Sequence, residues 1–245
     1  MLRTYWQSSR APRYSLLFAL PLLIVYQVLA LIVPAGPGGI GIRNGADVIF
    51  DALFFWIAGA WGPRLFMLAL IGVGAWLVAK DIRANRGNLS PAVMAGMLLE
   101  SVCLSLVFGL VVGGLTAALL GAPPPAMAIG QASAHLARST LLMLSIGAGI
   151  YEELLFRVVL VGLIAWSTTK LLGFRPLVAG IIASVLGALI FSAFHYIGPY
   201  GDRLDVYSFV FRTVAGLFFS GLYLLRGFGI TAWTHALYDV LLLLR

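Results

Sequence analysis

The sequence predicts an all-α fold, a polytopic membrane bundle of about seven to eight helices around a polar intramembrane cavity. Of the 245 residues, 61% are hydrophobic and only 10% are charged, whereas a soluble domain is about 25% charged. A soluble fold of this length cannot bury so much apolar surface, and disorder needs low hydrophobicity. The apolar runs are long and do not alternate as strands do. These observations exclude a soluble globular domain, a disordered chain and a β-barrel.

Apolar runs of roughly the length that crosses a bilayer, about 20 residues, define the expected helices. In order they are Tyr14–Val33, Arg64–Val78, Val93–Leu120, Ser139–Trp166, Pro176–Tyr196, Val206–Leu225 and Gly229–Leu244. A shorter stretch, Asp47–Trp61, carries Asp47 and Asp51 on one helical face. We expect it to lie in the interface or to be re-entrant. We treat residues 1–245 as a single integral membrane domain.

The basic residues predict the orientation. With a cytoplasmic N-terminus, the alternating loops place nine of the 16 Lys and Arg residues inside and five outside, as the positive-inside rule favours. We therefore expect a multi-pass protein of the bacterial inner membrane, surrounded by the lipid bilayer and without a nucleic-acid partner. The N-terminal segment could also be a signal peptide cleaved near Ala35. Its apolar region is longer than is usual in signal peptides, so we expect it to be retained as the first helix. Cys103 is the single cysteine, which excludes an intrachain disulfide, and we expect it in the core.

Four of the nine acidic residues, Glu100, Glu152, Glu153 and Asp239, fall inside apolar runs. Each ionised side chain there costs about 2.5–3.5 kcal/mol on insertion scales, so pairing or function must justify it. For Glu100 we expect a structural ion pair with Arg212 of another run.

The segment Tyr151–Arg157, YEELLFR, contains two adjacent glutamates. Glu153 and Arg157 are four residues apart on one helical face, in the favoured order for an ion pair. Glu152 is rotated by about 100° and has no such partner. A spare carboxylate in a low dielectric suits a general base or acid. The alternative is a structural pair beside a glutamate that faces a water-filled crevice.

Two further motifs contain histidines. In HALYD, the four-residue spacing of His235 and Asp239 suits a divalent metal or a carboxylate that fixes the imidazole tautomer. A buried hydrogen bond between helices is the alternative. In FSAFH, His195 follows Phe191 at the end of a run, where an interfacial histidine is the simpler interpretation. His135 is expected in an external loop.

Together EExxxR, FxxxH and HxxxD, in this order on three runs, are more specific than any one motif. The set resembles the CPBP family of intramembrane proteases, which contains the type II CAAX prenyl endopeptidases. The matching residues are Glu152, Glu153, Arg157, Phe191, His195, His235 and Asp239. The resemblance covers about Thr140–Leu242, so we expect a protease-like core at residues 139–245.

The resemblance implies hydrolysis of a peptide bond in a membrane-associated protein or peptide by a glutamate-activated water. Glu152 would be the general base, and His195 would hold and activate the water. His235 and Asp239 would face the oxyanion, while Glu153 and Arg157, with Phe191, would support the site.

Some family members have Asn at the position of Asp239, and an ionised Asp cannot donate a hydrogen bond. Asp239 is then protonated or orients His235. Alternatively, His195, His235 and Asp239 bind a divalent metal such as zinc. We favour a reaction that needs no cofactor.

Two other functions stay open. The chain could be a non-enzymatic membrane protein of the same fold, immunity- or chaperone-like, or a proton- or ion-coupled transporter.

Counting residues along the helices predicts that the motif residues lie at different depths in the membrane. At about 1.5 Å per residue, Glu152 lies about 21–24 Å and His195 about 28 Å from the cytoplasmic ends of their helices, but His235 only about 10 Å. Straight, flush helices would keep these residues apart.

Overall fold

In the computed structural model, residues 2–33, 41–85, 89–121, 136–198 and 201–244 are described. All regular elements within these ranges are helical, which confirms the predicted all-α class. The helices are α1 (Leu2–Arg10), α2 (Pro12–Ile32), α3 (Gly45–Ala58), α4 (Gly62–Ala84), α5 (Pro91–Leu120), α6 (Arg138–Gly147), α7 (Gly162–Lys170), α8 (Pro176–Phe194), α9 (Val206–Arg226) and α10 (Phe228–Leu243). His135 and Ala35 lie outside the described residues.

Proline and glycine account for several helix ends. Proline stands in the first turn of α2, α4, α5 and α8, where its missing N–H costs no hydrogen bond. Gly227, with φ of 80°, separates α9 from α10, a conformation that glycine adopts without strain. Between α6 and α7 the chain continues through two π-helical segments, η4 (Ala148–Glu152) and η5 (Leu154–Val161). The helical path is therefore continuous from residue 138 to residue 170.

Five helical stretches within the described residues are long and apolar enough to cross a membrane. They are Pro12–Ile32, Gly45–Ala84, Pro91–Leu120, Pro176–Phe194 and Val206–Arg226. α10 is apolar but shorter, and the predicted run 139–166 lies within the continuous helical path that contains the π-helical segments. The described residues are thus those of a multi-pass membrane protein, and the number of membrane crossings stays a prediction.

The stretch predicted to be interfacial or re-entrant lies within α3 and the following turn, and α3 forms a tight helical hairpin with α4. α3 ends at Gly59, whose φ is 56°, and α4 packs back against α3. A Cβ on Gly62 would collide with the backbone of Phe54, so the turn needs glycine there. The depth of α3 in the bilayer stays a prediction.

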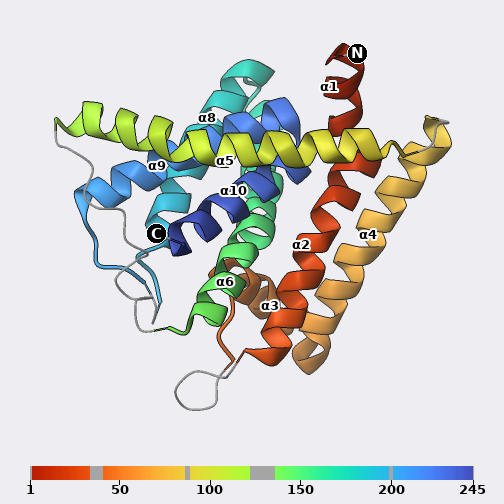
Figure 1. The fold of residues 1–245 in the computed structure, drawn as a ribbon, viewed down its shortest axis with the longest axis horizontal. Helices are drawn as coiled ribbons and strands as arrows, with labels where there is room; N and C mark the ends of the chain where they lie inside the picture. Colours follow the sequence, from red (N-terminus) through yellow and green to blue (C-terminus); the bar gives the residue numbers. More distant parts are fainter. Residues whose placement is uncertain (1, 34–40, 86–88, 122–135, 199–200, 245) are drawn as a thin grey trace.

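Helix α10 joins the two apolar cores of the bundle. One core surrounds Tyr26 and Tyr151 and includes Ala232 and Ala236 of α10. The other surrounds residues of α5 and α9 and includes Tyr238 of α10. Figure 1 shows α5 running across the view while α2 and α4 run down it, with α10 inclined between them. The polar site described below lies along α10, where these cores meet.

Two predictions are wrong, the pairing of Glu100 with Arg212 and the position of Cys103 in the core. Glu100 pairs with Arg226 through two contacts of 2.6 and 2.7 Å, and Arg212 pairs with Asp202. The reason is that the end of α9, which carries Arg226, lies against α1 and the first part of α5, while Arg212 is about four turns earlier. Cys103 is exposed on α5 instead of packed in the core.

Candidate active site

The three motifs come from separate elements that meet beside α10. Glu152 lies on η4 and Arg157 on η5, and Glu153 is the residue between these two π-helical segments. This path approaches α10 closely at Gly149, where a Cβ would collide with the carbonyl oxygen of Ala232. A π-helical turn at a functional site is a recurrent feature of enzymes. Here the close approach brings the two glutamates against the next motif, on α10.

Glu153 holds two groups at once. Its Oε2 lies 3.1 Å from Nε of Arg157, so the predicted ion pair is present. Its Oε1 lies 2.8 Å from Nδ1 of His235, a contact that sequence spacing did not predict. Both Glu153 and Arg157 are fully buried, and the guanidinium lies 4.5 Å from the centre of the Phe191 ring. The buried charges are therefore paired and covered by an aromatic face.

The ring of His235 is oriented by three neighbours. It stacks on Phe219, with ring centres 4.4 Å apart and planes inclined by 22°. An ionised carboxylate only accepts hydrogen bonds, so Nδ1 donates to Glu153. The opposite nitrogen, Nε2, lies 3.7 Å from Oδ2 of Asp239. The predicted contact within α10 is thus the longer of the two.

The tautomer of His195 follows from its backbone contact. Nδ1 lies 2.8 Å from the carbonyl oxygen of Phe191, and because a carbonyl only accepts, Nδ1 carries the proton. In the neutral ring, Nε2 is then an acceptor. The turn that carries His195 is held from the next loop, since the backbone N–H of Asp202 donates to the His195 carbonyl at 2.9 Å. Asp202 is in turn paired with Arg212.

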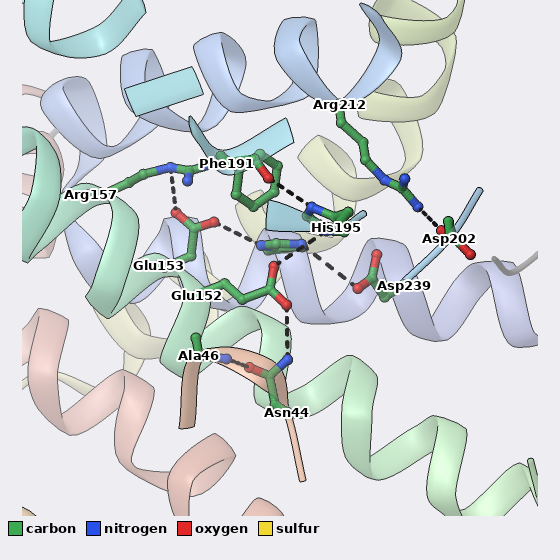
Figure 2. A network of polar contacts seen from close by, with 11 residues as sticks. Asn44, Ala46, Glu152, Glu153, Arg157, Phe191, His195, Asp202, Arg212 and Asp239 are labelled. Atoms are coloured by element: carbon green, nitrogen blue, oxygen red, sulfur yellow. Dashed lines mark hydrogen bonds and ion pairs between the residues drawn. The ribbon is translucent and has the colours of Figure 1, made fainter. Parts of the chain in front are cut away.

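Glu152 is buried and its carboxylate lies between the side-chain amide of Asn44 and the ring of His195. Its Oε1 accepts a hydrogen bond of 2.9 Å from Nδ2 of Asn44. Its Oε2 lies 3.9 Å from Nε2 of His195 and has no hydrogen-bond partner among the described residues. Figure 2 shows Glu152 between Asn44 and His195. One oxygen is thus held, and the other faces a histidine acceptor.

Asn44 is the site residue that the motif analysis missed. It precedes the apolar stretch that becomes α3 and caps that helix through Oδ1, which accepts from the N–H of Ala46 at 2.9 Å. An asparagine before an apolar run is a known helix-start signal. That signal predicts the cap but not the contact with a glutamate 108 residues further along the chain.

The difference in membrane depth that was predicted for the motif residues does not separate them in the structure. Nδ1 of His235 touches Glu153, and His195 faces Glu152. Because α10 is inclined to α2 and α6 (Figure 1), the number of residues along α10 does not measure depth in the bundle. The assumption of straight, flush helices was therefore wrong.

The predicted metal ligands are not grouped as a metal site in the part of the chain that the structure describes. Among the described residues, no three His, Cys, Asp or Glu side chains are arranged to hold a metal ion. The alternative in which His195, His235 and Asp239 bind a divalent metal stays a prediction. We therefore derive no chemical step through a metal.

Comparison with known proteins supports the motif analysis. Residues 134–241 match the family model described as Type II CAAX prenyl endopeptidase Rce1-like. The matched region contains all three motifs, and the match confirms the resemblance to the CPBP and type II CAAX endopeptidase group. No curated protein and no solved structure matched the chain.

Proposed function

We propose that this protein is an intramembrane endopeptidase that hydrolyses a peptide bond in a membrane-associated protein or peptide, with a water activated by Glu152. The observation that carries the proposal is the pair formed by Oε2 of Glu152 and Nε2 of His195. These two acceptors are 3.9 Å apart, and each has its other polar atom held by a separate hydrogen bond. The family match supports the same class of reaction.

This pair can orient one water molecule for attack. The water donates one proton toward Glu152 and the other toward His195, which leaves an oxygen lone pair directed at the substrate carbonyl carbon. As the new C–O bond forms, Glu152 takes the first proton. When the C–N bond breaks, Glu152 returns that proton to the leaving nitrogen. The products are a carboxyl terminus and an amine, and Glu152 is regenerated.

His235 stabilises the negative charge that develops on the substrate carbonyl oxygen. Nδ1 donates to Glu153, so Nε2 carries a proton only when the ring is doubly protonated, and this imidazolium donates from Nε2 to the oxyanion that forms on the substrate. Asp239 lies 3.7 Å from Nε2: when ionised it favours the doubly protonated ring, and when protonated it donates to the oxyanion itself. Oxyanion donors of this kind are worth about 10²–10³ in kcat. Arg157 neutralises Glu153, and no cofactor enters the scheme.

We also propose that the protein lies in the bacterial inner membrane with a cytoplasmic N-terminus. Basic residues that were predicted to be cytoplasmic gather at one end of the bundle. Arg13, at the start of α2, pairs with Asp81 near the end of α4, and Arg10 donates to the carbonyl of Leu224 near the end of α9. This clustering supports the orientation given by the positive-inside rule.

The test is a comparison of peptides from membranes of cells that express the wild type, Glu152→Ala or Cys103→Ser at matched levels. Cys103 is exposed and remote in sequence from the motifs, so its variant is the matched control. We expect a new peptide terminus with the wild type and with Cys103→Ser, and none with Glu152→Ala. Equal peptide patterns in all three would refute the protease. Proton or ion flux that depends on Glu152 would then favour a transporter, and its absence a non-enzymatic relative.

A further inference from the structure

We propose that Asn44 is a positioning residue for Glu152, contributed by the half of the chain that lies outside the three motifs. Its role is to donate a hydrogen bond to Oε1 and so to hold the carboxylate with Oε2 toward His195. This inference rests on the proposed function of Glu152 as general base. Asn44 is itself buried, as is Glu152, so water does not compete for the contact.

The amide orientation of Asn44 follows from its cap. Oδ1 accepts from the backbone N–H of Ala46 at 2.9 Å, and only an oxygen can do so. The amide nitrogen is therefore the atom that lies 2.9 Å from Oε1 of Glu152. An amide N–H only donates and a carboxylate only accepts. The two contacts agree with each other, and the reversed amide would lose both.

A buried network anchors Asn44 from helix α2. Its backbone N–H donates to the hydroxyl of Tyr26 at 3.1 Å. That hydroxyl donates to Oδ2 of Asp47 at 2.7 Å, and Arg43 pairs with the same oxygen at 2.7 Å. Tyr26 and Asp47 are both buried. The donor is therefore fixed before any substrate binds, which is the condition under which an electrostatic contact costs no reorganisation during reaction.

The contact determines which carboxylate oxygen is available. Without a donor on Oε1, the two oxygens of Glu152 exchange by rotation of the carboxylate, and the buried charge loses a charge-assisted hydrogen bond. Such bonds are worth about 1.5–3 kcal/mol, which corresponds to about a 10- to 100-fold change in rate. We expect loss of Asn44 to lower kcat by this factor and to leave KM unchanged.

Two substitutions separate positioning from capping. Asn, Asp and Ser cap helices almost equally well, so Asn44→Asp and Asn44→Ser retain the cap of α3. Ser removes the amide donor, and Asp places a second carboxylate against Glu152. We expect Asn44→Ser to unfold at nearly the wild-type temperature in detergent, and Asn44→Asp to unfold at a lower temperature because it buries a second carboxylate beside Glu152. Both should have a lowered kcat, and Asp should be the worse of the two. Wild-type kcat in both would overturn the proposal.

The kinetic probe is a quenched fluorogenic peptide that spans the cleavage site found in the membrane comparison. A second readout needs no substrate. The infrared carboxylate bands of Glu152, identified by subtracting the Glu152→Gln spectrum, should shift in Asn44→Ser because a hydrogen bond to one oxygen is lost. If the wild type cleaves nothing, the proposed protease fails while the infrared bands still test the contact. Unshifted bands would refute the positioning role on their own.

Discussion

His235 makes its shortest polar contact with Glu153, 82 residues earlier in the chain, and not with Asp239 on its own helix. Nδ1 lies 2.8 Å from the glutamate, whereas Nε2 lies 3.7 Å from the aspartate. Glu153 also binds Arg157 at 3.1 Å. The second glutamate of the EE pair therefore joins two motifs into one unit. The two adjacent glutamates therefore have different partners, because Glu152 faces His195 and Glu153 holds His235.

Glu153→Gln should lower stability as well as activity. The substitution leaves Arg157 buried without its counter-charge, and breaking one side of a buried pair costs about 3–5 kcal/mol. We expect a clearly lower unfolding temperature in detergent for Glu153→Gln and an almost unchanged one for Glu152→Gln, with peptide cleavage lost in both. The double variant Glu153→Gln/Arg157→Met should recover part of the stability because no charge is left unpaired. Equal unfolding temperatures of Glu153→Gln and the wild type would contradict this account.

Asp239→Asn should retain most of the activity. Asparagine has the size of aspartate, removes a negative charge beside Nε2 of His235 and adds an N–H that can donate to an oxyanion. We expect cleavage rates for Asp239→Asn within about tenfold of the wild type, against a fall of about 10²-fold or more for Asp239→Ala. The measurement is the rate of product formation from the same peptide. An inactive Asn variant would mean that the carboxylate itself is required.

Chelation should leave cleavage unchanged. The residues predicted as metal ligands do not form a group that could hold an ion within the described ranges, so the proposed reaction uses only protein side chains and water. The test is the cleavage rate of purified protein before and after treatment with EDTA and 1,10-phenanthroline, with its zinc content measured in parallel. Activity that is lost on chelation and restored by zinc would return His195, His235 and Asp239 to the role of ligands.

Gly149→Ala should damage the site, and Gly162→Ala should not. A Cβ at residue 149 would collide with the Ala232 carbonyl, whereas one at residue 162 meets nothing within 4 Å. Overpacking typically costs about 1–3 kcal/mol. It would also separate Glu153 from His235, since Gly149 is where their elements approach. We expect Gly149→Ala to lose stability and cleavage, and Gly162→Ala to match the wild type. Similar behaviour of the two variants would show that the close approach is unimportant.

Contacts within a single helix were predicted more successfully than contacts between residues of different helices. The Glu153–Arg157 pair was predicted because a four-residue spacing aligns side chains on any regular helix. The pairing of Glu100 with Arg212 was wrong because it required the register of α5 against α9, which neither helix encodes alone. Asn44 shows the same limit. Its capping role is readable beside an apolar run, but its contact with Glu152 requires knowledge of where α3 begins relative to η4.

Local features of the sequence predicted the all-α membrane fold class, the approximate positions of the helices and the seven motif residues, because hydropathy, proline and glycine placement and short spacings act locally along the chain. The packing of the helices in three dimensions was needed to establish which motif residues are in contact. The contacts of Glu153 with His235, Glu152 with Asn44 and Glu100 with Arg226 join residues 82, 108 and 126 positions apart. They depend on how α10 crosses its neighbours and where glycine allows close approach, and those are properties of packed helices and not of any one segment.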